Sequence, residues 1–207
     1  MKVNKSDLIT RNYTFEIRAD ENESNESIIV GRPIVYGSKT DISGFFEEII
    51  DVGALANTDL NDVRFLVNHD TSKIPLARSR KGDVNSTMQL TVDNDGLGIR
   101  VVLDTENNAD ARSLYSAIQR GDVSGMSFGF YVDGETWENL NSDYPTRHIT
   151  SIQKVIEVSA VTFPAYEATS IAARDKLALD DARAVIHSVK KDDLELEKLK
   201  IEYLYKF

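Results

Sequence analysis

The stretch "GDVSGMSFGFYVDG", residues 121–134, alternates between two kinds of side chain and decides the fold of the segment around it. Successive side chains of a β-strand point to opposite faces, so large apolar residues share one face here and small residues share the other. The first face carries Met126, Phe128, Phe130 and Val132, and the second carries Gly125, Ser127, Gly129 and Tyr131. We expect a buried strand with little crowding around the Ser127 hydroxyl. Such room suits either an approaching substrate backbone or a covering structural element, and the pattern leaves both interpretations open.

Two hairpins are expected before this strand. Residues 13–19 and 27–37 are short apolar runs on either side of a purely polar loop, which predicts an antiparallel pair. Residues 87–93 and 97–104 also alternate, and "DNDG" between them is a strong turn signal because Asn, Asp and Gly tolerate positive φ. These segments predict an α+β fold in which antiparallel strands dominate.

Three further segments complete the expected core. "DVRFLVNHD", residues 62–70, predicts a strand that gives way to a loop at His69. Residues 108–122 place apolar side chains at helical spacing and predict one amphipathic helix that leads into the opening stretch. Residues 147–166 are typical of a second buried pair of strands, and "FFEEIIDVGAL", residues 45–55, suits a strand or a short helix.

Composition narrows the classes of function. The chain of 207 residues has no cysteine, which excludes thiolate metal sites, disulfides and a cysteine nucleophile. Its net charge of -10 disfavours binding to nucleic acid, because such a field repels a phosphate backbone. The sequence contains neither an apolar run long enough to span a membrane nor a secretory signal, so we expect a cytoplasm-like location and no membrane partner.

The charge is distributed unevenly and suggests a domain boundary. Residues 174–207 contain 8 basic and 8 acidic side chains, so the whole net charge lies in residues 1–173. The second part has no Pro or Gly and predicts one or two helices. We therefore expect a single domain over residues 1–173 and a helical tail over residues 174–207 that serves docking, scaffolding or dimerisation.

Three residue types suggest nucleophilic chemistry. A serine becomes a nucleophile when a base accepts its proton, and histidine suits this role. Of the three histidines, His187 lies in the tail, His148 begins a strand, and His69 ends an apolar strand beside a loop. The alternative for His69 is a turn histidine bonded to its own backbone. Glu157 stands in an apolar strand pattern, where a charge is costly unless it is paired, which suits an acid that orients an imidazole.

Four segments in order resemble the prohead, or capsid maturation, serine proteases of tailed bacteriophages, which are akin in fold to the herpesvirus capsid-assembly proteases. They are "FLVNHD" (65–70), "PLARS" (75–79), "GDVSGMSFGF" (121–130) and "IEVSAVTFPAY" (156–166), and the resemblance spans roughly residues 10–175. It implies a β-barrel flanked by helices, a nucleophile at Ser127, a general base at His69 and an orienting acid at Glu157.

The resemblance also implies partners and a location. The expected substrates are the phage major capsid protein and a scaffolding protein or segment, cleaved inside the assembling procapsid in the host cytoplasm, with self-cleavage and no metal or organic cofactor. A homodimer is expected from the related viral enzymes. Because those enzymes use a second histidine as the third residue of their catalytic triad, His148 is the alternative to Glu157. By the same resemblance, backbone N–H groups near Arg78 are expected to stabilise the oxyanion.

Two other classes of function compete with this prediction. A catalytically inactive scaffold or head-assembly protein would retain the fold and use Ser127 and His69 for packing. A lipase or esterase would use "GMSFG", which has the G-x-S-x-G spacing, but a nucleophile elbow needs a strand, a sharp turn and then a helix. The predicted order here is helix and then strand, which disfavours the lipase.

Overall fold

A computed structural model describes residues 8–13, 17–21, 26–162, 175–185, 188, 195–198 and 200. The chain divides into two compact units. The first comprises residues 1–40, 49–136 and 148–166, and the second comprises residues 41–48, 137–147 and 167–207. None of the helices in the described ranges is long and apolar enough to cross a membrane.

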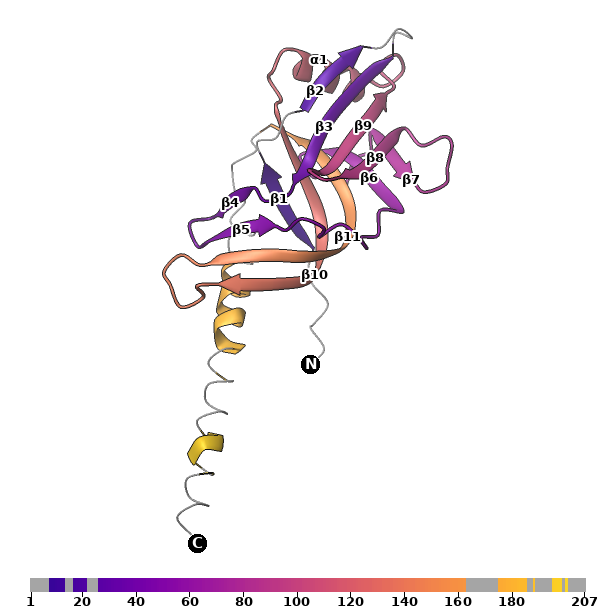
Figure 1. The fold of residues 1–207 in the computed structure, drawn as a ribbon. Helices are drawn as coiled ribbons and strands as arrows, with labels where there is room; N and C mark the ends of the chain where they lie inside the picture. The colour runs from indigo at the N-terminus through magenta and orange to yellow at the C-terminus, as the bar shows by residue number, and fades with distance from the viewer. Residues whose placement is uncertain are drawn as a thin grey trace. The chain divides into compact units, whose positions relative to one another are not determined.

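The larger sheet has seven strands and contains the opening stretch (Figure 1). Its main order is β1 (Ile9–Tyr13), β10 (Gly125–Glu138), β11 (Thr146–Val161), β5 (Phe46–Ile50) and β4 (Lys39–Ile42). A branch adds β6 (Asp62–Val67), which pairs with β11, and β7 (Ala77–Arg80), which pairs with β6. The β6–β11 pair is parallel, whereas β1–β10 and β6–β7 are antiparallel. The sheet is therefore mixed, and its parallel pair is an exception to the mainly antiparallel pairing that the sequence predicted.

The smaller sheet has four antiparallel strands and confirms both expected hairpins. Its order is β2 (Ile17–Glu21), β3 (Ser27–Val35), β9 (Gly96–Leu103) and β8 (Met88–Asp93). The β8–β9 turn forms because the Asp93 carboxylate accepts the backbone N–H groups of Asp95 (2.9 Å) and Gly96 (3.1 Å). Gly96 has a φ of 137°, and a Cβ there would lie 2.0 Å from the Ile34 carbonyl oxygen, so only glycine fits.

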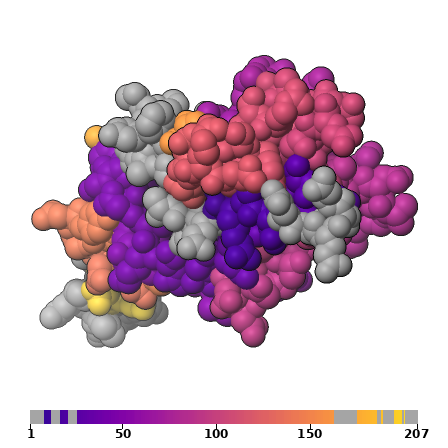
Figure 2. Space-filling model, turned by 90° about the horizontal axis from the view of Figure 1, so that it is seen from above, coloured from indigo at the N-terminus to yellow at the C-terminus, as the bar shows by residue number. Residues whose placement is uncertain are grey.

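The helix α1 (Ala109–Gln119) lies within residues 108–122, where the sequence predicts one amphipathic helix. The Asn108 side chain accepts hydrogen bonds from the N–H groups of Asp110 and Ala111, which satisfies two donors of the first turn. Its apolar face is buried, and the Tyr115 hydroxyl on that face donates to the Asp20 carbonyl oxygen (3.3 Å). The helix lies beside β2 in Figure 1, and indigo atoms of the N-terminal strands reach the surface in the view from above (Figure 2).

The apolar face of β10 lies in the main core, as predicted. Met126, Phe128 and Phe130 are fully buried, and the two phenyl rings stack with centroids 4.7 Å apart. The core also holds Phe65 of β6 and Val155 of β11. Burial of each such side chain is favourable by roughly 1.5–3 kcal/mol, so this face fixes the orientation of the strand. The opposite face, which carries Ser127, is thereby fixed as well.

The β-barrel that the resemblance implied, closed or nearly closed, is not found among the residues that the structure describes. Closure requires the edge strands of a sheet to pair, but β1 and β4 stand at the two ends of the larger sheet. Two open sheets result. Residues 147–166 were also expected to form a pair of strands, whereas β11 is a single strand of 16 residues, and "FFEEIIDVGAL" starts with the strand β5.

Part of the tail is helical, at residues 175–185 and 195–198. In the second unit Leu179 is buried in a small apolar cluster with Ile42, Phe46 and Leu140. The same unit buries the ion pair Arg147–Glu48, whose nitrogen and oxygen lie 3.1 Å apart. A boundary between residues 173 and 174 stays a prediction.

Candidate active site

His69 and Glu157 form a short hydrogen bond. His69 Nδ1 lies 2.7 Å from Glu157 Oε1, and the side chains are 24% and 5% exposed. An ionised carboxylate only accepts hydrogen bonds, so Nδ1 carries the proton and the basic lone pair of a neutral imidazole lies on Nε2. The structure thus places a partly exposed imidazole against a buried carboxylate, and the roles of base and orienting acid that the sequence assigned to them stay predictions.

The parallel pairing of β6 with β11 brings the two residues together. Its register places Arg64 opposite Glu157 and Val67 opposite Ala160. The strand β6 ends at Val67, and the next residues, Asn68 and His69, turn with φ angles of 51° and 59°. This left-handed turn places His69 Nδ1 within hydrogen-bond distance of Glu157 Oε1.

Hydrogen bonds from the end of β11 hold the turn. Left-handed backbone costs a non-glycine residue about 1–3 kcal/mol, although asparagine tolerates it better than most. The Asn68 N–H donates to the Ala160 carbonyl oxygen (2.9 Å), and the Asn68 side-chain oxygen accepts from the N–H (3.0 Å) and hydroxyl (3.2 Å) of Thr162. The His69 N–H donates to the Ser159 hydroxyl (3.2 Å). These bonds offset the cost of the turn.

Ser127 is fully buried, and its hydroxyl donates to the Arg11 carbonyl oxygen at 2.7 Å. The contact arises because β1 pairs with β10 in a register that places Asn12 opposite Ser127. A hydroxyl has one proton to donate, so the Ser127 proton is directed to Arg11 in this structure rather than to an imidazole.

Ser127 nevertheless lies on the face of β10 that points toward Glu157. Residues 127 and 129 share a face, and a Cβ built on Gly129 would lie 2.6 Å from Glu157 Oε1. The two α-carbons of such a pair are separated by roughly 7 Å along the strand. The space above Gly129 is therefore occupied by the Glu157 carboxylate, whereas the sequence left open whether a substrate backbone or a covering structural element lies there.

The other candidates lie in different surroundings. His148 Nδ1 lies 2.8 Å from Asp51 Oδ1, so its partner is a different carboxylate. The Arg78 N–H donates to the Thr87 hydroxyl (3.0 Å), and its guanidinium pairs with Asp62, which lowers the pKa of that carboxyl. This N–H is thus engaged within the β6–β8 region. His187 lies outside the described residues.

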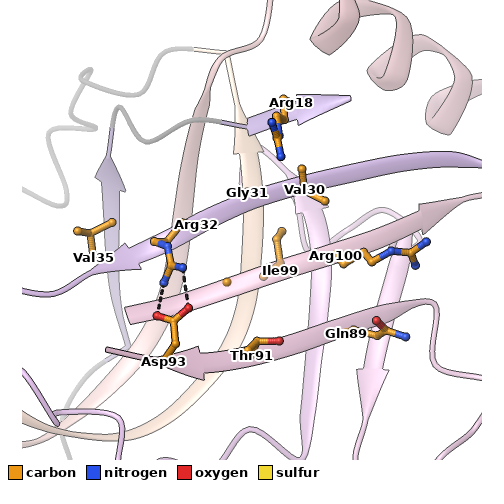
Figure 3. A pocket seen from close by; sticks show the side chains of 11 residues that line it. Arg18, Val30, Gly31, Arg32, Val35, Gln89, Thr91, Asp93, Ile99 and Arg100 are labelled. Atoms are coloured by element: carbon orange, nitrogen blue, oxygen red, sulfur yellow. Dashed lines mark hydrogen bonds and ion pairs between the residues drawn. The ribbon is translucent and has the colours of Figure 1, made fainter. Parts of the chain in front are cut away.

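A hollow on the smaller sheet is separate from these residues (Figure 3). Its walls come from β2, β3, β8 and β9, whereas Ser127 and Glu157 lie on strands of the larger sheet and His69 in the turn after β6. Arg32 and Asp93 form a two-pronged ion pair across it, with bonds of 2.6 and 2.7 Å, which lowers the pKa of Asp93 to about 2. Within the part of the chain that the structure describes, no three metal-ligating side chains cluster.

Sequence reasoning missed two residues at the site. Ser159 contacts both Glu157 and His69, and Arg11 supplies the carbonyl that engages Ser127. The spacing of two residues between Glu157 and Ser159 places them on one face of a strand, which is a signal that sequence alone contains. The Arg11 contact has no such local signal, because it joins strands far apart in the chain.

The family model for the Caudovirus prohead serine protease matches residues 13–183. The chain belongs to this family. It is 34% identical to the prohead protease of Enterobacteria phage HK97 over 155 aligned residues. This alignment covers 73% of this chain and 61% of the HK97 protein. The chain thus spans less than two thirds of the length of this prohead protease. A solved structure of the bacteriophage T4 capsid assembly protease, gp21, aligns with a TM-score of 0.44 at 11% identity, over 76% of this chain and 99% of that one.

Proposed function

We propose that this chain is a serine endopeptidase of phage head maturation with Ser127 as nucleophile, His69 as general base and Glu157 as orienting acid. The observation that carries the proposal is the 2.7 Å bond between His69 Nδ1 and Glu157 Oε1. It supplies a base of defined tautomer beside a buried acid, on the same side of β10 as Ser127.

The reaction is acyl transfer to serine and then to water. His69 Nε2 takes the Ser127 proton as the hydroxyl oxygen attacks the peptide carbonyl carbon, and the carbonyl oxygen becomes an oxyanion. Collapse of this intermediate breaks the C–N bond, and His69 returns the proton to the leaving amine. Water then repeats the sequence on the ester and releases the acid. Glu157 stabilises the imidazolium in both halves of the reaction.

Catalysis requires the Ser127 hydroxyl to exchange partners. In the resting structure its proton is bonded to the Arg11 carbonyl oxygen of β1. The active hydroxyl must release this carbonyl and turn toward His69. Apo enzymes often have loose catalytic hydrogen bonds that tighten when substrate binds, so the resting contact is compatible with the proposed role.

We propose substrates and assembly from family membership. The substrates are the phage major capsid protein and the scaffolding protein or segment, within the immature shell, and the chain also cleaves itself. The catalytic domain covers residues 1–173, and the tail over residues 174–207 docks the enzyme, resembles a scaffold segment or joins two subunits of a homodimer.

The second candidate is an inactive head-assembly protein with the same fold. The bond from Ser127 to Arg11 favours it, because a buried serine that binds a neighbouring strand is sufficient as a packing residue. Both candidates predict the same fold and differ only in whether the hydroxyl reacts.

Co-expression of the chain with the phage major capsid protein separates the two candidates. The protease yields shortened capsid protein, and Ser127→Ala abolishes the shortening. Ser124→Ala is the matched control, because Ser124 belongs to the same segment but is exposed and precedes the strand. Equal processing by wild type and Ser127→Ala would reject Ser127 as the nucleophile.

A further inference from the structure

Ser159 joins the acid and the base through a single hydroxyl. It lies two residues after Glu157 on β11 and is fully buried. Its Oγ donates to Glu157 Oε2 at 2.6 Å and accepts the His69 backbone N–H at 3.2 Å. The hydroxyl therefore donates its one proton to Glu157 and accepts with one lone pair from His69, the two residues proposed to act with Ser127.

These contacts close a hydrogen-bond cycle, which we define as His69, Ser159 and Glu157. The cycle runs from the His69 backbone N–H to Ser159 Oγ, from that hydroxyl to Glu157 Oε2, and from Glu157 Oε1 to His69 Nδ1. One carboxylate oxygen is bonded to Ser159 and the other to the imidazole. Because both oxygens are engaged, the carboxylate has a fixed orientation, and the imidazole plane is fixed with it.

The cycle also explains why the left-handed backbone at His69 is maintained. His69 has a φ of 59°, which is unfavourable for a residue with a Cβ, and its N–H points into the protein toward β11. Without the Ser159 oxygen this N–H would lose its partner beside a buried carboxylate. The backbone turn and the ring orientation are thus held by the same side chain.

We propose that Ser159 is a positioning residue of the protease, which sets the tautomer and position of the His69 imidazole for its reaction with Ser127. The proposal rests on the proposed function of Ser127, His69 and Glu157. Ser159 does not touch the substrate. It acts through the carboxylate that it binds and through the backbone of the base.

Two measurements on the full chain test the proposal. The first is the rate at which a fluorophosphonate labels Ser127, and the second is the NMR resonance of the His69 Nδ1 proton. The chain has three histidines, so substitution of each assigns this resonance. We expect Ser159→Ala to slow labelling by about 10–100-fold, because a displaced catalytic group costs roughly that factor. We also expect the Nδ1 proton resonance to shift upfield or broaden as the carboxylate loses its orientation.

Thr58→Val is the matched control. The Thr58 hydroxyl is partly buried and donates to the Ile152 carbonyl oxygen at 2.7 Å, so its loss also breaks a hydrogen bond to β11 but outside the cycle. Thr58→Val should label at the wild-type rate with an unchanged Nδ1 resonance. If Ser159→Ala does not fold, Ser159→Cys retains a weaker donor of similar shape, and we expect labelling between the wild-type rate and that of Glu157→Gln.

The outcomes distinguish this proposal from the proposed function. Labelling and Nδ1 resonance at wild-type values in Ser159→Ala would overturn the role of Ser159. Absence of any label on Ser127 in the wild type would overturn the nucleophile. In that case the resonance alone decides whether Ser159 positions His69: a changed resonance supports the positioning, and an unchanged one refutes it.

Discussion

Gly129→Ala adds one methyl group at the point where β10 meets the acid. The built Cβ lies 2.6 Å from Glu157 Oε1 and 3.3 Å from two carbons of the same side chain. Ordinary contact begins near 3.4 Å, so the carboxylate must retreat by about 0.8 Å. Its bond to His69 Nδ1 is 2.7 Å long, and a retreat of that size stretches it to at most about 3.5 Å, where a hydrogen bond is nearly lost.

The expected loss of activity is large and the expected loss of stability is small. A misplacement of about 1 Å in a catalytic group can lower the rate about 100-fold. Overpacking destabilises a protein by about 1–3 kcal/mol. Replacing glycine by alanine at an ordinary φ stabilises it by about 0.4–1 kcal/mol, because the unfolded chain then has less conformational entropy to lose. The protein should therefore fold and react slowly.

The assay is the labelling rate of Ser127 by a fluorophosphonate, with the thermal midpoint measured alongside. Gly134→Ala is the control, because it lies on the same strand and its Cβ would press at 2.8 Å on the Thr150 hydroxyl instead of the acid. We expect Gly134→Ala to react at nearly the wild-type rate. Equal rates for Gly129→Ala and wild type would refute the inference that Glu157 orients the base.

Three further predictions follow from other contacts. Glu157→Gln should lower the rate of Ser127 labelling about 10³–10⁴-fold with little loss of folding, because the amide can hold the wrong imidazole tautomer. A near-normal rate in this variant, together with an inactive His148→Ala, would assign the role of orienting residue to His148. Asp93→Asn should destabilise the protein above about pH 4, where the Asp93 carboxyl is ionised in both the folded and the unfolded chain. Because the pKa of Asp93 is lowered to about 2 in the folded protein, the difference in urea midpoint between variant and wild type should shrink as the pH falls from about 4 to about 2. A difference that stays constant over this range would contradict the Arg32–Asp93 pair. Arg147→Met should lower the free energy of unfolding by about 3–5 kcal/mol, because it removes the guanidinium that pairs with the fully buried Glu48 carboxylate, and a loss below about 1 kcal/mol in a denaturation curve would argue against the importance of this pairing.

Local patterns in the sequence predicted the elements that local forces determine. The alternation in β10, the helical spacing of apolar residues in α1 and the turn at Asp93 to Gly96 involve neighbours in the chain, so each was predicted at nearly its observed place. The strand that ends before His69 was predicted for the same reason.

Pairing between distant strands was not predictable in this way. The alternation of β6 and β11 indicates which side chains are buried, but it does not specify a parallel partner some 90 residues away. The sequence therefore indicated that Glu157 needs a partner, since a buried charge is costly alone, without identifying the geometry of that partner. The contact between Ser127 and Arg11 depends on the register of β1 against β10, which is equally long-range.

The most direct measurement is peptide mapping of the intact chain after reaction with a fluorophosphonate. We expect one labelled peptide, with the phosphonyl group on Ser127 Oγ, and loss of the label in His69→Ala. The reason is that, in the proposed mechanism, Ser127 attacks only when the imidazole bonded to Glu157 accepts its proton. A label on another serine, or on Ser127 at the same rate in His69→Ala, would contradict the proposed chemistry.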